Sequence, residues 1–287
     1  MDEIQEDSAA IPPVVLLMAC QPQRVNLLQR ALASVYAQSV LPHRAVLVMD
    51  GESTPDPILP AGAASPVQIH YLANHSASGA ANTWNVGIRY ATQHWPDGYL
   101  AILDDDDEWE AEHLATCIAT ARRHQWPDVV LSGLRMIVDG VEQNCPPIHE
   151  VSERHFLVGN PGWHGSNTFI RLATLLRAGA FTPDLASCND RDLAIRMLAL
   201  GDIRFAFTRR HTAKWHLDRS RQALSSRNSP EKLAGLARFY CLHGHRMNED
   251  VCRAYFERAE TVFGWRKEDI LNHAKEYQHA DFSAARA

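Results

Sequence analysis

Short apolar runs alternate with segments of helical period along the first part of the chain. The apolar runs predict strands at residues 14–18, 45–49, 67–72 and 99–103. Between them, residues 25–38 and 80–94 carry apolar positions three and four residues apart, which is the spacing of an amphipathic helix. Strands and helices that alternate with short connections predict a parallel sheet covered by helices.

The pattern loosens after about residue 132. Before that point it also predicts a helix at 110–124 and a strand at 129–131, and after it strands at 136–141 and 166–171 and a helix at 190–200. A glycine-rich loop separates them at residues 159–165. From Ser229 onward the period is mostly helical, so we expect a C-terminal helical extension that packs on the body or joins two copies into a homodimer.

The overall charge excludes several classes of partner. The net charge of −6 gives no footprint for nucleic acid or an anionic membrane. No pair of the six cysteines has C-x-x-C spacing, and the first ten residues are acidic where a signal peptide is basic. The apolar stretch at residues 11–20 is too short to span a bilayer. We therefore expect a cytoplasmic protein with reduced thiols, for which peripheral membrane contact stays open.

Four consecutive aspartates, Asp104 to Asp107, follow the strand expected at 99–103. Adjacent carboxylates repel one another, and a buried strand end strengthens the repulsion. A divalent cation such as Mg²⁺ or Mn²⁺ would turn that repulsion into attraction. The alternative is an acidic turn that caps the next helix through Asp107 and Glu108.

These residues carry a resemblance. The segment Leu103 to Trp109 resembles the Asp-x-Asp segment of family 2 glycosyltransferases, which have the GT-A fold. Three further segments agree in the same order, at residues 48–53, 79–87 and 189–193, and the similarity spans roughly residues 13–220. The sequence departs from the family pattern at three positions. Met49 is present where the family often has an aspartate, Trp84 where it has an arginine, and Asn189 where it has a glutamate.

The resemblance implies an α/β GT-A fold, Rossmann-like, with a mostly parallel sheet flanked by helices. It divides the chain into a flexible tail (1–11), a nucleotide-sugar-binding half (12–132), an acceptor-binding and catalytic half (133–222) and the helical extension (223–287). It also implies a nucleoside-diphosphate sugar as donor, with a UDP-sugar favoured, a divalent cation, and an acceptor that carries a hydroxyl group.

Roles on the donor side follow from the same resemblance. Asp50 would contact the base or ribose, and Gly79 and Asn85 belong to the donor-binding segment. Asp104 would contact the ribose or the metal shell. Asp106 would be the direct metal ligand, and the roles of Asp105 and Asp107 stay open because one of an adjacent pair usually points away from the site.

His216 is a further candidate ligand, with His211 the weaker competitor; a histidine beside a tryptophan can equally be packed and hydrogen-bonded. Arg219 and Arg221 could clamp the diphosphate from a basic segment, 214–221, that is expected to be a loop.

Asp190 is the candidate general base, which would take the proton of the acceptor hydroxyl in an inverting transfer. The alternative is a helix N-terminal charge shared with Asp192. Trp163 and His164 could stack on an acceptor ring or close the core.

Two other functions remain open. Sugar nucleotidyltransferases share much of the fold, but they carry a glycine-rich loop where this chain has residues 20–24 without glycine. A catalytically inactive binding or scaffold protein is the other alternative.

Overall fold

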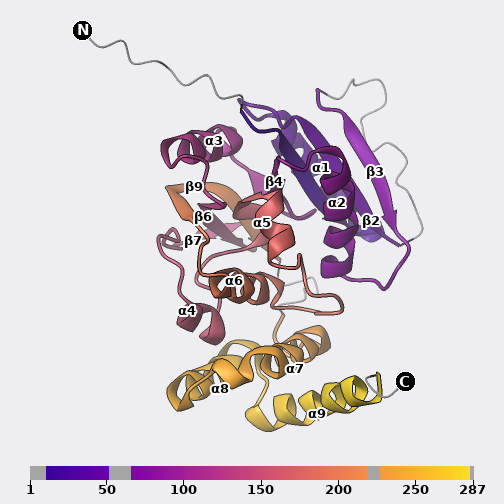
Figure 1. Cartoon of the computed structure of the whole chain (residues 1–287), viewed down its shortest axis with the longest axis vertical. Coiled ribbons are helices and arrows are strands. Elements are labelled where there is room, and N and C mark those ends of the chain that lie inside the picture. The colour runs from indigo at the N-terminus through magenta and orange to yellow at the C-terminus, as the bar shows by residue number, and fades with distance from the viewer. Residues whose placement is uncertain (1–10, 52–65, 219–225, 285–287) are drawn as a thin grey trace.

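The computed structural model describes residues 11–51, 66–218 and 226–284, with side chains described to residue 277. Figure 1 shows a mixed α/β body with helices on both sides of a twisted sheet, and a group of three helices at one end. The described strands form one nine-stranded sheet. They are β1 (Val14–Cys20), β2 (Arg44–Asp50), β3 (Ile69–Asn74), β4 (Tyr99–Ile102), β5 (Glu108–Trp109), β6 (Val129–Val138), β7 (Val141–Gln143), β8 (Thr168–Arg171) and β9 (Phe205–Leu217).

The strand order is β3-β2-β1-β4-β8-β6-β9-β5, with β7 paired to β6. The strands β3, β2, β1 and β4 run parallel, and β6 and β9 are parallel to each other. Strand β8 lies antiparallel between β4 and β6. The predicted GT-A architecture, a mostly parallel sheet flanked by helices, is confirmed.

Successive residues of the strands face opposite sides of the sheet, as the period of two requires. Leu17, Val48 and Ile102 belong to the apolar core on one face, and Leu16, Leu47 and Ala101 to the core on the other. Both sets are almost fully buried. Because both faces of these strands are buried, their sequences are continuous apolar runs and do not alternate between apolar and polar residues.

The helices divide between the two faces of the sheet. They are α1 (Val25–Tyr36), α2 (Ala80–His94), α3 (His113–Arg123), α4 (Glu153–Val158), α5 (Leu172–Arg177), α6 (Asn189–Ala199), α7 (Pro230–His243), α8 (Glu249–Phe263) and α9 (Lys267–Ala284). Helices α1 and α3 cover one face, and α2, α5 and α6 cover the other.

The three C-terminal helices continue the core of the body. In Figure 1 they lie together beyond α4 and α6. Phe239 of α7 and Tyr255 of α8 belong to the same buried cluster as the sheet residues Leu17 and Val48. The guanidinium of Arg191, on α6, lies 4.1 Å above the Phe239 ring. The extension therefore packs on the body of the protein through α6; a homodimer stays a prediction.

Most predicted elements are present, and several predicted boundaries were wrong. The strands expected at 129–131 and 136–141 are one strand, β6. Residues 214–217, expected as the start of a basic loop, are the end of strand β9, which pairs with β6 along its length. The helix expected from residue 110 begins at His113, after the short strand β5. Helices α4 and α5 were missed because each has only six residues.

Some predictions fall outside the described residues: Arg219, Arg221 and residues 1–10 of the tail. None of the helices in the described part of the chain is long and apolar enough to cross a membrane.

One contact ties the extension to the loop before α6. A Cβ added at Gly235 of α7 would lie 2.7 Å from the backbone nitrogen of Ser187. Alanine is the better helix former by about 1 kcal/mol. We nevertheless expect Gly235→Ala to lower the free energy of unfolding by about 1–3 kcal/mol, because the backbone must move apart.

Urea unfolding measures this effect. Ala234→Gly, at the neighbouring position, controls for helix propensity and should lower stability by about 1 kcal/mol. A Gly235→Ala variant more stable than the parent would contradict the close packing.

Candidate active site

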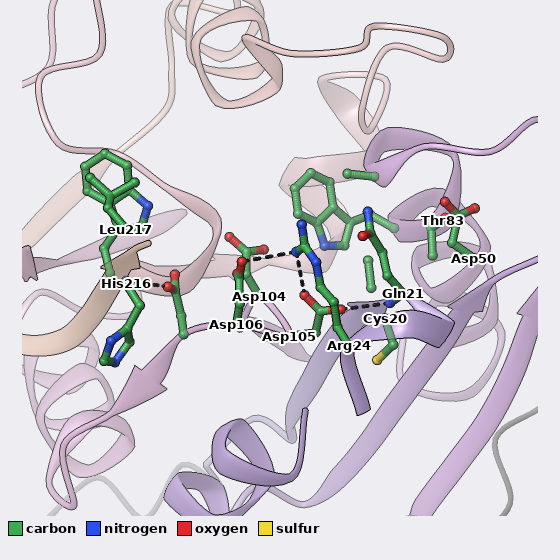
Figure 2. Close-up of a pocket in the computed structure, with 15 residues that line it drawn as sticks. Cys20, Gln21, Arg24, Asp50, Thr83, Asp104, Asp105, Asp106, His216 and Leu217 are labelled. Atoms are coloured by element: carbon green, nitrogen blue, oxygen red, sulfur yellow. Dashed lines mark hydrogen bonds and ion pairs between the residues drawn. The ribbon is translucent and has the colours of Figure 1, made fainter. Parts of the chain in front are cut away.

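A cavity opens where β1, β2 and β4 end, at the carboxyl edge of the parallel strands, where open α/β sheets bind ligands. Figure 2 shows its wall, which includes the acidic run, Asp50 and the end of β9. The strands themselves place these residues. The acidic run follows β4, Asp50 ends β2, and β9 crosses behind the run through its pairing with β5 and β6.

Asp105 is held by the turn that follows β1. Its carboxylate accepts the backbone N–H of Gln21 at 2.8 Å and a hydrogen bond from the Arg24 guanidinium at 3.0 Å. The pKa of Asp105 is raised, because burial and the neighbouring Asp106 outweigh these contacts. Arg24 stands at the end of a single helical turn, Pro22–Arg24, which directs it toward the acidic run.

Asp107 points into the protein and does not cap the next helix. It accepts the Ser166 hydroxyl at 2.5 Å and the backbone N–H of His216 at 2.9 Å. Burial, followed by the charge of Asp106, raises the pKa of Asp107 to about 8. The alternative that treated Asp107 and Glu108 as a helix cap was wrong, because Glu108 belongs to β5 and the N-cap residue of α3 is Glu112.

The carboxylate of Asp104 faces the cavity without a hydrogen bond or ion pair from a described residue. Its backbone N–H donates to the Ser166 hydroxyl, and its backbone carbonyl accepts the N–H of Asp107. Burial and the charges of Asp107 and Asp106 raise the pKa of Asp104 well above its ordinary value. A Cβ at Gly165 would lie 2.8 Å from the Asp104 carboxylate, so the glycine leaves it room.

The guanidinium of Arg24 contacts Asp106 as well as Asp105. The Asp106 carboxylate lies 3.1 Å from the Arg24 guanidinium, and its backbone carbonyl accepts a hydrogen bond from Arg30. The acidic run thus brings four carboxylates to the cavity, and the ion pairs of the described residues join two of them to Arg24.

A hard divalent cation fits this donor set, since carboxylate oxygens are its preferred ligands and it would offset their repulsion. Among the described residues no cluster of three or more His, Cys, Asp or Glu side chains has metal-binding geometry. The remaining ligands would have to come from a substrate and water, as is usual for Mg²⁺.

Asp50 is fixed at the edge of the cavity by four hydrogen bonds. They come from the Ser78 hydroxyl, the Gly79 N–H, the Thr83 hydroxyl and the Asn74 amide, at 2.7 to 3.1 Å. Burial alone would raise the pKa of Asp50, but these bonds outweigh it and lower the pKa. Gly79 has a φ of +126°, a conformation that glycine adopts without strain, and this turns its N–H toward Asp50.

Asn85 does not line the cavity. Its amide exchanges two hydrogen bonds with the backbone of Phe181, at 2.8 and 3.1 Å, and so ties α2 to the segment before α6. Trp84 lines the cavity instead and packs on Phe181 with ring centroids 4.6 Å apart. The indole N–H of Trp84 is buried and has no hydrogen-bond partner among the described residues.

His216 lies beside the acidic run, but its ring turns away. In Figure 2 the imidazole points away from Asp104 and Asp106. Its Nε2 atom lies 2.6 Å from the Glu108 carboxylate. Burial, then Arg30, lowers the pKa of His216. His211 is farther along β9 and its Nε2 contacts the carbonyl of Cys145.

Asp190 lines a second cavity, at the N-terminus of α6. This cavity and the first share a wall made of Trp84, Asp104, Trp215, Ala80 and Leu217. Burial raises the pKa of Asp190 to about 7, although the charge of Lys232 opposes the shift. A carboxyl that titrates near neutrality can accept a proton from a hydroxyl group.

Asp192 has a structural role that differs from that of Asp190. It is almost fully buried, with hydrogen bonds from Arg196 at 2.7 Å, His243 at 2.9 Å and Thr182 at 2.7 Å. These contacts outweigh burial and lower the pKa of Asp192. It therefore joins α6 to α7 and does not share the helix N-terminal role that the sequence left open.

Trp163 and His164, in the glycine-rich loop before β8, have different surroundings. Trp163 is only 1% exposed and its indole N–H bonds the Thr168 hydroxyl, so it closes the core. His164 lines the second cavity and packs on Trp215, with centroids 4.4 Å apart. Burial, then Lys232, lowers the pKa of His164 to about 4, which leaves it neutral.

Sequence reasoning missed several residues of the site. Gln21, Arg24 and Ser166 hold the acidic run, and Lys232 faces Asp190 from the extension. Arg24 was recognisable as a cation directly after the first strand. Ser166 and Lys232 carried no signal, because their roles depend on chain segments far away in sequence.

Comparisons with known proteins agree with this geometry. The family model described as glycosyl transferase family 2 matches residues 23–181, more than half of the 287 residues. No curated protein matches the chain by sequence.

Solved structures share its fold. TarS of S. aureus, residues 1–349 with UDP-GlcNAc, is 17% identical with a TM-score of 0.59; the match covers 89% of this chain and 74% of that one. The mannosyltransferase PcManGT of Pyrobaculum calidifontis, with GDP-Man and Mn²⁺, is 15% identical with a TM-score of 0.55, covering 96% and 76%. The family match spans Arg24 and the acidic run, and the chain therefore belongs to glycosyl transferase family 2.

Proposed function

We propose that this protein is a metal-dependent, inverting glycosyltransferase that moves a sugar from a nucleoside-diphosphate sugar to a hydroxyl acceptor. The observation that supports this most strongly is the pair of adjoining cavities. One holds the acidic run, the other holds Asp190, and Asp104 belongs to the wall between them. A donor in the first cavity and an acceptor in the second would meet at that wall.

The donor side would use the acidic run and Asp50. Asp106 and Asp104 would hold a divalent cation, Mn²⁺ or Mg²⁺, and Asp50 would contact the base or ribose. When bound, the cation would neutralise charge that develops on the leaving nucleoside diphosphate. His216 would join the ligand set only after its imidazole rotates away from Glu108. A UDP-sugar is the first donor to test, since TarS is solved with UDP-GlcNAc; PcManGT is solved with GDP-Man and Mn²⁺.

Asp190 would act as the general base. Its carboxylate takes the proton of the acceptor hydroxyl while the hydroxyl oxygen forms a bond to the anomeric carbon. The bond from that carbon to the diphosphate oxygen breaks, and its electron pair leaves with the nucleoside diphosphate. One displacement inverts the anomeric centre.

Two polar groups in the cavity walls, unpaired within the described part of the chain, favour an active enzyme over an inactive scaffold protein. The indole N–H of Trp84 and the amide oxygen of Asn189 are buried and have no hydrogen-bond partner among the described residues. Unpaired buried polar groups cost about 1–3 kcal/mol each, and a ligand would satisfy them. The nucleotidyltransferase alternative is weaker, since the turn after β1 directs Arg24 toward two aspartates, while those enzymes carry a glycine-rich loop there.

Asp106→Ala should abolish metal-dependent donor binding. The expected loss in affinity for UDP in the presence of Mn²⁺ is more than about tenfold, because a carboxylate ligand of the cation is removed. Calorimetry with UDP, with and without Mn²⁺, measures it. Asp97→Asn, an exposed aspartate remote from the cavity, is the control. Wild-type binding of both UDP and Mn²⁺ by Asp106→Ala would refute the assignment.

Asp190→Asn should reduce kcat by about 10²–10⁴-fold and leave UDP binding unchanged, because only proton transfer is removed. In the parent, kcat/KM should rise with pH and level off above about pH 7, where Asp190 becomes ionised. Asp184→Asn, an exposed residue shortly before α6, is the matched control. A parent profile that is flat between pH 5 and 8 would count against Asp190.

The raised pKa of Asp190 also predicts how Asp190→Asn changes the stability of the protein. Because burial raises the folded pKa of Asp190 above its ordinary value of 3.8, the folded state binds more protons between that value and about pH 7. The buried Asp190 carboxyl therefore has no effect on stability below about pH 4. Its destabilising effect increases from there to about pH 7 and is complete above that pH. Asp190→Asn should raise the Tm at pH 8 and leave it nearly unchanged at pH 4.

The anomeric configuration of the product tests the single displacement. Proton NMR of the first product formed from an α-linked nucleotide sugar should show the β configuration. A product that retains the α configuration would require a different mechanism.

A further inference from the structure

The cavity beside Asp190 is bounded by the N-terminus of α6 and by α7 and α8 of the helical extension. It holds about 440 Å³, which is within the range of sites for small ligands. Trp84 and Trp215 form part of its wall on the donor side. On the other side it is lined by three cationic side chains: Arg191, Lys232 and Arg258.

Lys232 is buried, and no carboxylate of a described residue pairs with it. Its side chain is part of a residue only 8% exposed, on the first turn of α7. The ammonium lies 4.0 Å from the Cys188 sulfur and 4.3 Å above the Phe263 ring. Burial lowers the pKa of Lys232, and the Cys188 thiol and Asp190 only partly oppose that.

The two arginines also lack carboxylate partners among the described residues. Arg191 is 6% exposed and donates to the backbone carbonyls of Phe156 and Leu157, both at 2.7 Å. Arg258 reaches in from the more exposed side and packs on Gly159, where a Cβ would lie 2.7 Å from its Nε atom. Burial and the charge of Arg191 lower the pKa of Arg258.

These charges are not balanced within the cavity. The acidic groups that face them there are Asp190, Asp104 and the Cys188 thiol. Asp104 lies on the wall toward the donor cavity, and burial raises the pKa of Asp190 to about 7. The cations lower the pKa of the Cys188 thiol despite its burial, and Lys232 is the largest of these influences. Buried charges without partners are unfavourable, so an anion from outside would stabilise this arrangement.

The same cavity also contains a buried polar group without a hydrogen-bond partner among the described residues. The amide oxygen of Asn189 is buried without a partner among the described residues, although Asn189 is only 7% exposed and lines the cavity. Asn189 is the first residue of α6, so unpaired backbone N–H groups and the positive end of the helix dipole lie at the same place. An anionic ligand that also carries a hydroxyl would use both features.

The donor diphosphate is the other anion that these cations could bind. The cavity with the acidic run has its own cation, Arg24, and the described residues of its wall do not include Arg191, Lys232 or Arg258. Lys232 and Arg258 come from the extension, on the far side of Trp84 and Trp215. The observations therefore favour the acceptor as the partner of this cationic set.

We propose that the acceptor is an anionic hydroxyl compound, whose phosphate or carboxylate group binds Lys232, Arg258 and Arg191 while its hydroxyl faces Asp190. This rests on the proposed transferase function and adds the substrate class. It also gives the C-terminal extension a role in recognition, because two of the three cations stand on its helices α7 and α8.

The test compares matched probes in calorimetry, with UDP and Mn²⁺ present. The pairs are glycerol with glycerol 3-phosphate, and glucose with glucose 6-phosphate and with glucuronate. At least one anionic probe should bind about tenfold or more tightly than its neutral partner, and phosphate and carboxylate arms show which anion is preferred. No preference in any pair overturns the proposal. Inorganic phosphate that binds as tightly as the best probe also overturns it, since the site would then recognise a free anion.

Two variants connect the preference to the residues. Lys232→Met keeps the apolar stem and removes a buried charge without a carboxylate partner, so it should fold with unchanged or higher Tm. Arg258→Gln provides the same test at a more exposed position. Each should remove most of the preference for the anionic probe. Arg253→Gln, an exposed arginine on the same helix, should keep it.

The affinity for UDP with Mn²⁺ separates this proposal from the proposed function. We expect it to be unchanged in Lys232→Met and Arg258→Gln. A tenfold loss of UDP affinity in these variants would assign the cations to the donor diphosphate and overturn the proposal. Failure of the parent protein to bind UDP with Mn²⁺ would instead contradict the proposed function.

Discussion

The burial of carboxylates at the end of β4 is the constraint on which the site depends. Asp105 and Asp107 are 3% and 1% exposed, and each is held by partners from a different part of the chain. Asp105 is bound by the turn after β1, and Asp107 by Ser166 and the backbone of β9. Because these bonds fix the run from both sides, segments that are far apart in sequence meet at one place.

Buried ionisable groups on both sides of the run oppose the stability of the fold. Burial raises the pKa values of Asp104, Asp107 and Asp190, which means that the fold resists their ionised forms. On the opposite side, Lys232 and Arg191 are buried without carboxylate partners among the described residues. A cation and a nucleotide on one side, and an anionic acceptor on the other, would supply the missing charges. Such opposed, unbalanced sets are expected where ligands complete the structure.

The sequence predicted what local pattern controls. The strands β1, β2 and β4, the helix α2 and the position of the acidic run follow from apolar spacing and were predicted closely. The end of β9, residues 214–217, was predicted as part of a basic loop, because its pairing partner β6 lies about 75 residues earlier in the sequence. Lys232 was predicted only as part of a packing helix. Its position in the cavity is set by the docking of α7 on α6, which no local pattern encodes.

Thermal unfolding with UDP and Mn²⁺, added separately and together, tests most directly whether the acidic run is a cation-assisted donor site. A ligand that binds only the folded state raises the Tm with the logarithm of its saturation. If the cation and the diphosphate share the site, the Tm shift with both should exceed the sum of the separate shifts, and a chelator should remove the excess. Equal shifts for UDP with Mn²⁺ and with chelator would contradict the account.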